Sequence, residues 1–99
     1  MNLLEEARIE INAVDAEMAK LFERRMRAAE KVAAYKKEMG LPILDTAREA
    51  KVIENGAARM VDETLRAYYV QFLKNNMAIS RAYQGRILEG MKVAYSVPE

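Results

Sequence analysis

Residues 3–39 read LLEEARIEINAVDAEMAKLFERRMRAAEKVAAYKKEM, and this stretch decides the fold. Apolar side chains recur in it at alternating steps of three and four, the spacing of one face of an α-helix. The positions on this face are Leu4, Ala7, Ile11, Val14, Met18, Leu21, Arg25, Ala28, Val32, Tyr35 and Met39. We therefore expect one uninterrupted helix over about residues 3–39, ended by Gly40-Leu41-Pro42.

This expected helix is too long for a chain of 99 residues to cover. At about 1.5 Å per residue it is about 55 Å long, whereas a compact domain of this size has a radius of gyration of about 13 Å. The apolar face therefore needs a second chain, and an intertwined helical homodimer is the simplest closed arrangement.

Two further helices are expected after the first. Asp45 or Thr46 is able to cap a second helix over about 46–59, which Asn55-Gly56 weakens. Asp62 is the expected N-cap of a third helix over about 62–91. The stripe of that helix is Leu65, Tyr69, Leu73, Met77, Ser80, Gln84, Ile87 and Met91. Residues 1–99 thus form one all-α domain of three helices (long, short, long), with an unstructured tail from Tyr95.

The composition excludes several classes of function. The chain is 52% hydrophobic and carries 16 basic and 15 acidic residues, a net charge of +1 that attracts neither nucleic acid nor a membrane surface. It has no Cys and no His, so the thiolate nucleophile, the usual general base at neutral pH and the commonest metal ligands are missing. The lack of these ligands leads us to expect no metal site. Because no signal peptide or membrane span is recognisable, we expect a cytoplasmic protein.

Arg25 interrupts the apolar face of the first helix. Either its side chain reaches solvent or an anion meets it inside the protein, because burying an unpaired charge costs several kcal/mol. Lys36 lies eleven residues later, about 20° around the helix and about 16 Å along it, so the two cations share a face. For Arg25 or Lys36 alone, the more ordinary interpretation is that the aliphatic part of the side chain lies on the core and the charged group reaches water.

Arg8 borders the same face but lies about 25 Å from Arg25 along the helix. It cannot reach the same pocket within one chain. In a dimer with antiparallel first helices, however, Arg8 of one chain approaches Arg25 of the other. The alternative is an ordinary surface charge.

The second and third helices add polar side chains to the interior. Asp45, Arg48 and Glu49 share one face, although a helix start also favours acids, and Arg48 is able to pair with one of them. Ser80 and Gln84 occupy the apolar stripe, where a buried amide needs a partner or a wet cavity. Such a pocket suits a small anion with more than one carboxylate or phosphate, and a hydroxyl that a carboxylate binds.

Several motifs occur along the chain in one order. They are Arg8-Ile9-Glu10-Ile11, Asp15, Glu23-Arg24-Arg25, Lys36, Pro42-Ile43-Leu44-Asp45-Thr46-Ala47-Arg48-Glu49, and Ser80 with Gln84. The ordered set resembles the all-α class of chorismate mutases, and residues 42–49, which resemble that family's Pro-Val-x-Asp-x-x-Arg-Glu, are the most specific part. Asn55-Gly56 is a departure, since it interrupts the second helix, and the connection to the third helix is about one residue shorter than in familiar members.

The resemblance implies an isomerase that converts chorismate to prephenate in aromatic amino-acid biosynthesis, the route to Phe and Tyr. This intramolecular [3,3] rearrangement needs no metal and no cofactor. Lys36 and Gln84 are implied at the ether oxygen whose bond breaks, where they stabilise the charge of the transition state. Asp45 and Glu49 are implied to orient the ring hydroxyl.

The resemblance also implies an intertwined homodimer in which each active site receives an arginine from the partner chain. Arg8 of the partner and Arg25 would bind the two carboxylates of chorismate, with Ser80 assisting and Arg48 supporting the network. Positioned cations hold the flexible side chain of the substrate over its ring, and this pre-organisation lowers the barrier by several kcal/mol.

Two other interpretations stay open. Isochorismate pyruvate lyase is built on the same helical scaffold with a similar cationic pocket, and only identification of the product separates the two enzymes. A non-catalytic helical dimerisation or regulatory domain is the alternative of a different class. Against it stands the complete set of Arg8, Arg25, Lys36, Arg48, Glu49, Ser80 and Gln84.

Overall fold

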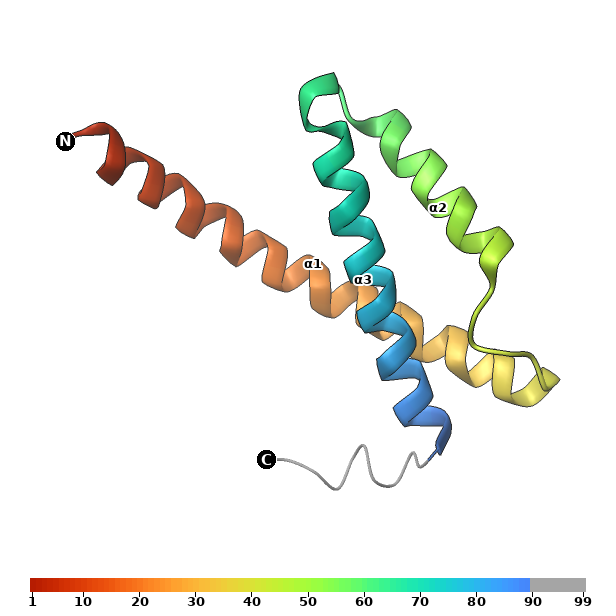
Figure 1. The fold of residues 1–99 in the computed structure, drawn as a ribbon. Coiled ribbons are helices and arrows are strands. Elements are labelled where there is room, and N and C mark those ends of the chain that lie inside the picture. The colour runs from red at the N-terminus through yellow and green to blue at the C-terminus, as the bar shows by residue number, and fades with distance from the viewer. Residues whose placement is uncertain (90–99) are drawn as a thin grey trace.

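A computed structural model describes residues 1–89, which form three helices (Figure 1). These are α1 (Leu3–Met39), α2 (Thr46–Arg59) and α3 (Glu63–Glu89). No strand occurs in residues 1–89, and the all-α, long-short-long arrangement is confirmed. The expected end of the third helix near residue 91 and the tail from Tyr95 lie outside the described residues. Within the same range, none of the helices combines the length and apolar character needed to cross a bilayer.

Local hydrogen bonds set the ends of α1 and the start of α2. Asn2 and Glu5 form a capping box, with each side chain accepting the other's backbone N–H at 2.9 and 3.0 Å. Gly40 ends α1 at a φ of 68°, a left-handed conformation that glycine adopts without steric cost. Asp45 caps α2 by accepting the backbone N–H of Arg48 at 3.0 Å. The first two helices accordingly have the bounds expected from the sequence.

The turn between α2 and α3 is fixed from both sides. Asp62 accepts the backbone N–H and the hydroxyl of Thr64 at 2.9 and 2.6 Å, and these bonds lower the pKa of the Asp62 carboxyl. Arg66 donates to the carbonyl oxygens of Ala57 and Met60 at 3.0 and 3.1 Å. Since the last carbonyls of a helix lack partners within it, Arg66 secures the end of α2 to α3.

The expectation that Asn55-Gly56 interrupts the second helix is wrong, because α2 continues without a break to Arg59. Gly56 is buried against α3. A Cβ atom added to it would lie 2.3 Å from Cδ1 of Leu73 and 3.4 Å from Cε2 of Tyr69. The missing side chain leaves room for the end of the Leu73 side chain, and this packing offsets the low helix propensity of glycine.

We expect Gly56→Ala to lower the unfolding temperature. Alanine favours the helix by about 1 kcal/mol, but crowding a packed interface costs up to about 3 kcal/mol, so the net effect is a destabilisation of up to about 2 kcal/mol. Asn55→Ala is the matched control, since Asn55 is exposed on the same helix and the change keeps or raises stability. Thermal unfolding followed by circular dichroism compares the two variants, and equal stability would contradict the close approach.

α1 and α2 both pack on α3, and within residues 1–89 they make no close backbone contact with each other. The small side chains of Ala29 and Ala33 are buried on α1. Tyr83 of α3 donates to Glu30, which also pairs with Arg27. This hydrogen bond raises the pKa of Tyr83, and burial adds to the effect. α1 and α2 are therefore each fixed to α3, and a space is left between α1 and α2.

The buried face of α3 follows the stripe expected from the sequence in its central part. Its buried residues are Leu73, Met77, Ser80, Gln84 and Ile87. Leu65, at the start of the stripe, is exposed instead.

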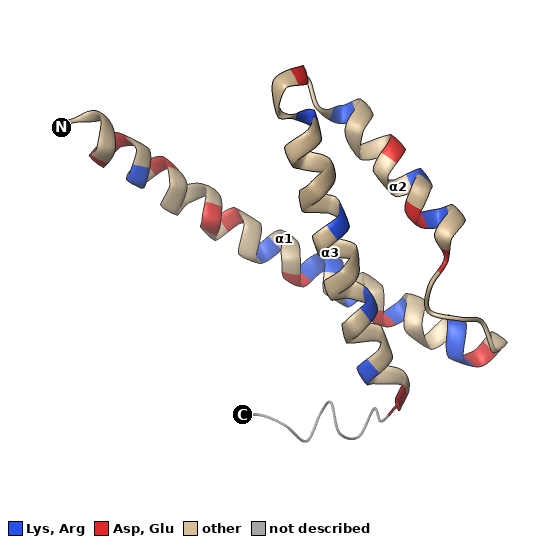
Figure 2. Cartoon of the chain, in the orientation of Figure 1, with Lys and Arg blue, Asp and Glu red and all other residues tan. Residues whose placement is uncertain are grey.

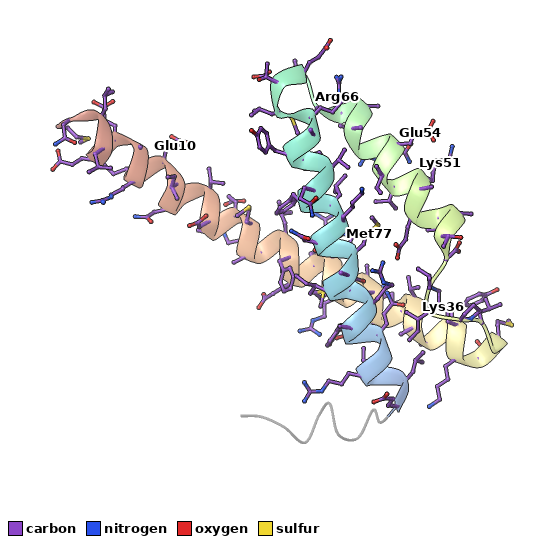
Figure 3. The ribbon with its side chains drawn as sticks, in the orientation of Figure 1. Glu10, Lys36, Lys51, Glu54, Arg66 and Met77 are labelled. Atoms are coloured by element: carbon purple, nitrogen blue, oxygen red, sulfur yellow. The ribbon has the colours of Figure 1, made fainter. Side chains whose placement is uncertain are left out.

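The N-terminal half of α1 extends away from the other two helices (Figure 3). Large apolar residues are exposed along it, among them Leu4, Ile11, Val14, Met18 and Leu21. The radius of gyration is 16.8 Å, compared with about 13 Å for a compact domain of this size. One chain therefore leaves the expected apolar face uncovered over this half.

Candidate active site

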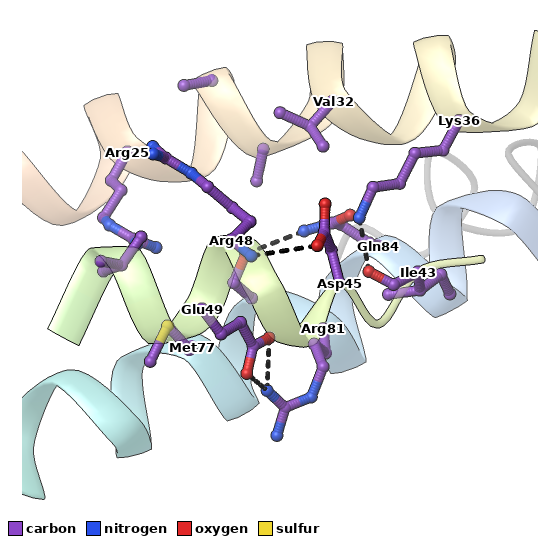
Figure 4. A pocket seen from close by; sticks show the side chains of 14 residues that line it. Arg25, Val32, Lys36, Ile43, Asp45, Arg48, Glu49, Met77, Arg81 and Gln84 are labelled. Atoms are coloured by element: carbon purple, nitrogen blue, oxygen red, sulfur yellow. Dashed lines mark hydrogen bonds and ion pairs between the residues drawn. The ribbon is translucent and has the colours of Figure 1, made fainter. Parts of the chain in front are cut away.

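A pocket of about 280 Å³ lies between α1 and α2, with α3 forming its third side (Figure 4). Basic residues gather in this region, where α1 passes α3 (Figure 2). Seven of the eight residues singled out in the sequence line the pocket: Arg25, Lys36, Asp45, Arg48, Glu49, Ser80 and Gln84. Arg8 is exposed near the free end of α1 and does not line the pocket of its own chain.

Three cations come from α1 and α2, whose backbones make no close contact in residues 1–89. Arg25 and Lys36 lie on α1, and Arg48 lies on α2. Within residues 1–89, neither the Arg25 nor the Arg48 guanidinium forms an ion pair. Lys36 donates to the carbonyl oxygen of Ile43, which holds its ammonium at the side of the pocket nearest the loop after α1. The two guanidinium groups are thus left to an anion that enters from solvent.

Ser80 and Gln84 are both buried on α3. Nε2 of Gln84 donates to Oγ of Ser80 at 3.1 Å, while Oε1 of Gln84 is buried without a partner in residues 1–89. An unpaired buried amide oxygen costs free energy. Turning the amide over exchanges its oxygen and nitrogen. The Ser80 hydroxyl then donates to Oε1, and Nε2 no longer donates to Ser80.

Glu49 pairs with Arg81, not with Arg48. Nη1 of Arg81 donates to both carboxylate oxygens of Glu49 at 2.6 Å. Sequence reasoning missed Arg81, because its partner lies on another helix and no local pattern links them. The available signal was weak, namely that Arg81 borders the buried stripe between Met77 and Gln84. Asp45 is exposed, and its carboxylate caps α2.

Apolar side chains form the rest of the lining, and they include Val32, Ile43 and Met77. Sequence reasoning placed Val32 and Met77 on helix stripes but assigned them no role in a site. An apolar wall beside charged groups lowers the local dielectric and strengthens their action on a ligand.

The charges of the pocket define what it is able to bind. Four basic residues (Arg25, Lys36, Arg48 and Arg81) and two acidic ones (Asp45 and Glu49) line it, a formal charge of +2. Among residues 1–89 no cluster of carboxylates is arranged to hold a metal ion. The arrangement suits a small dianion, and its donors are placed to stabilise negative charge that develops on an oxygen.

In a comparison with protein families, residues 7–85 match the family described as Chorismate mutase type II. This range contains all eight residues singled out in the sequence, and Arg81 as well. Comparisons with curated proteins and with solved structures gave no match.

Proposed function

Because the chain belongs to the chorismate mutase type II family, we propose that it is an isomerase that converts chorismate to prephenate. The observation that carries this proposal is the pocket charge of +2, with two guanidinium groups that no acid of residues 1–89 neutralises. Chorismate is a dicarboxylate, so its charge complements that of the pocket.

Binding the carboxylates is the first task of the site. In the reaction one C–O bond breaks and one C–C bond forms within a single molecule, so no proton, electron or group passes to the protein. The flexible enolpyruvyl arm must lie over the ring before its end is able to bond. Arg25 and Arg48, with Arg8 of a partner chain, hold the two carboxylates in that arrangement.

Stabilising the ether oxygen is the second task. Negative charge grows on this oxygen as the C–O bond breaks. The Lys36 ammonium, positioned through Ile43, and Nε2 of Gln84, freed when the amide turns over, are the donors that meet it. Their bonds strengthen as the charge grows, so they lower the barrier more than they tighten substrate binding.

A homodimer completes the site in this proposal. The exposed apolar half of α1 is the surface that a second copy covers. Arg8 lies on this half, outside the pocket of its own chain. An antiparallel arrangement of the two α1 helices brings it to the partner's pocket.

Loss of chorismate absorbance on addition of purified protein is the direct test, followed by identification of the product. We expect prephenate. Salicylate and pyruvate formed from isochorismate, without turnover of chorismate, would assign the scaffold to a lyase instead. No turnover of either substrate by the purified dimer would contradict an enzymatic role and favour a dimerisation or regulatory domain.

A further inference from the structure

We propose that Arg81 is a positioning residue, which acts on the substrate through Glu49. This inference rests on the proposed function. Glu49 enters the pocket from α2 and Arg81 from α3, and both line it. Their side chains are 24% and 36% exposed, so the pair is shielded from water more than an ordinary surface ion pair and its geometry is better defined.

The contact fixes the orientation of the Glu49 carboxylate. A single nitrogen, Nη1 of Arg81, contacts both carboxylate oxygens at 2.6 Å (Figure 4). A carboxylate has about four lone-pair positions, and this contact uses one on each oxygen. The remaining positions stay free to accept a hydrogen bond, as is required if Glu49 orients the ring hydroxyl of the substrate, the role that the family resemblance implies for it.

The pair also supports α2 at the pocket. α2 has no close backbone contact with α1 in residues 1–89, so its place beside the pocket depends on α3. Side-chain hydrogen bonds join α2 to α3 at two places in the same range. Arg66 binds the far end of α2, and Arg81 binds Glu49 at the pocket. Arg81 is thus the link that holds the catalytic end of α2.

Arg81 also neutralises the charge of Glu49, which is a second effect on the substrate through that residue. Without Arg81, Glu49 would present an unneutralised carboxylate to an incoming dianion, and like charges repel strongly in a partly apolar pocket. Removal of Arg81 should therefore weaken substrate binding and misplace Glu49 together, and both effects require Glu49 to be present.

A double-mutant cycle tests this dependence, with kcat and KM for chorismate measured for Arg81→Gln, Glu49→Gln and the double variant. We expect Arg81→Gln to lower kcat/KM by roughly 10- to 100-fold in the wild-type background. In the Glu49→Gln background the same change should cost about twofold or less. Arg81→Lys should keep kcat/KM within about threefold, because one nitrogen makes the whole contact.

Arg86→Gln is the matched control, since Arg86 is exposed on the same helix and the charge change is the same; its kcat/KM should stay at the wild-type value. Equal losses from Arg81→Gln in both backgrounds would show that Arg81 binds substrate itself and would overturn the inference. So would a lower unfolding temperature with unchanged kcat/KM, which marks a purely structural role. If the wild-type protein does not turn over chorismate, that result is seen before any variant is compared. It would overturn the proposed function and this inference together.

Discussion

Replacing Lys36 by alanine should lower kcat by about 100- to 1,000-fold, the usual cost of removing one donor to a developing oxyanion. The Lys36 ammonium lines the pocket and is held there by the carbonyl of Ile43. If it acts mainly in the transition state, the loss falls on kcat rather than on KM. Steady-state kinetics with chorismate give both constants, and circular dichroism checks that the helices remain.

Two further variants separate charge from packing at Lys36. Lys36→Met keeps an apolar stem against the pocket wall and removes only the ammonium, so it should lose as much kcat as Lys36→Ala. Lys37→Met makes the same change at the exposed neighbouring position and should leave kcat unchanged. A Lys36→Met protein with near wild-type turnover would exclude an electrostatic role for this residue.

The helix bounds were predictable because the signals that set them are local. Gly40 and Asp45 each act within one helical turn of their position, so their effect is visible in the sequence alone. Gly56 shows the limit of this reasoning. The low helix propensity of glycine is also a local property and is visible in the sequence. The packing of Leu73 against Gly56 is a contact between two helices, and the sequence does not show it.

The site was predictable to the extent that it follows helix periodicity and family motifs. Arg25 and Lys36 share a face of one helix, and the structure brings both to the pocket. The pairing of Glu49 with Arg81 was not predictable, because it depends on the distance between α2 and α3 and on the rotamers of both side chains. The role of Arg8 stays a prediction, since it requires a second chain.

Arg8→Ala and Arg25→Ala should each reduce activity about 100-fold or more, and yet mixing the two inactive proteins should restore it. In the proposed dimer each site combines Arg25 of one chain with Arg8 of the other. A heterodimer of the two variants therefore has one site with both arginines and one site with neither. After complete exchange of subunits, about a quarter of all sites are intact.

The reverse mixture controls for the number of arginines present. Wild-type protein mixed with the Arg8→Ala/Arg25→Ala double variant contains the same two side chains in the same amounts. Its heterodimers lack one arginine in each site, so activity should fall from about a half to about a quarter of the wild-type value as subunits exchange. Native mass spectrometry measures the exchange. If both arginines served a site within one chain, the first mixture would stay inactive and the second would stay at about a half of the wild-type activity. Only a site shared between chains makes the activity of the first mixture rise and that of the second fall, both to about a quarter.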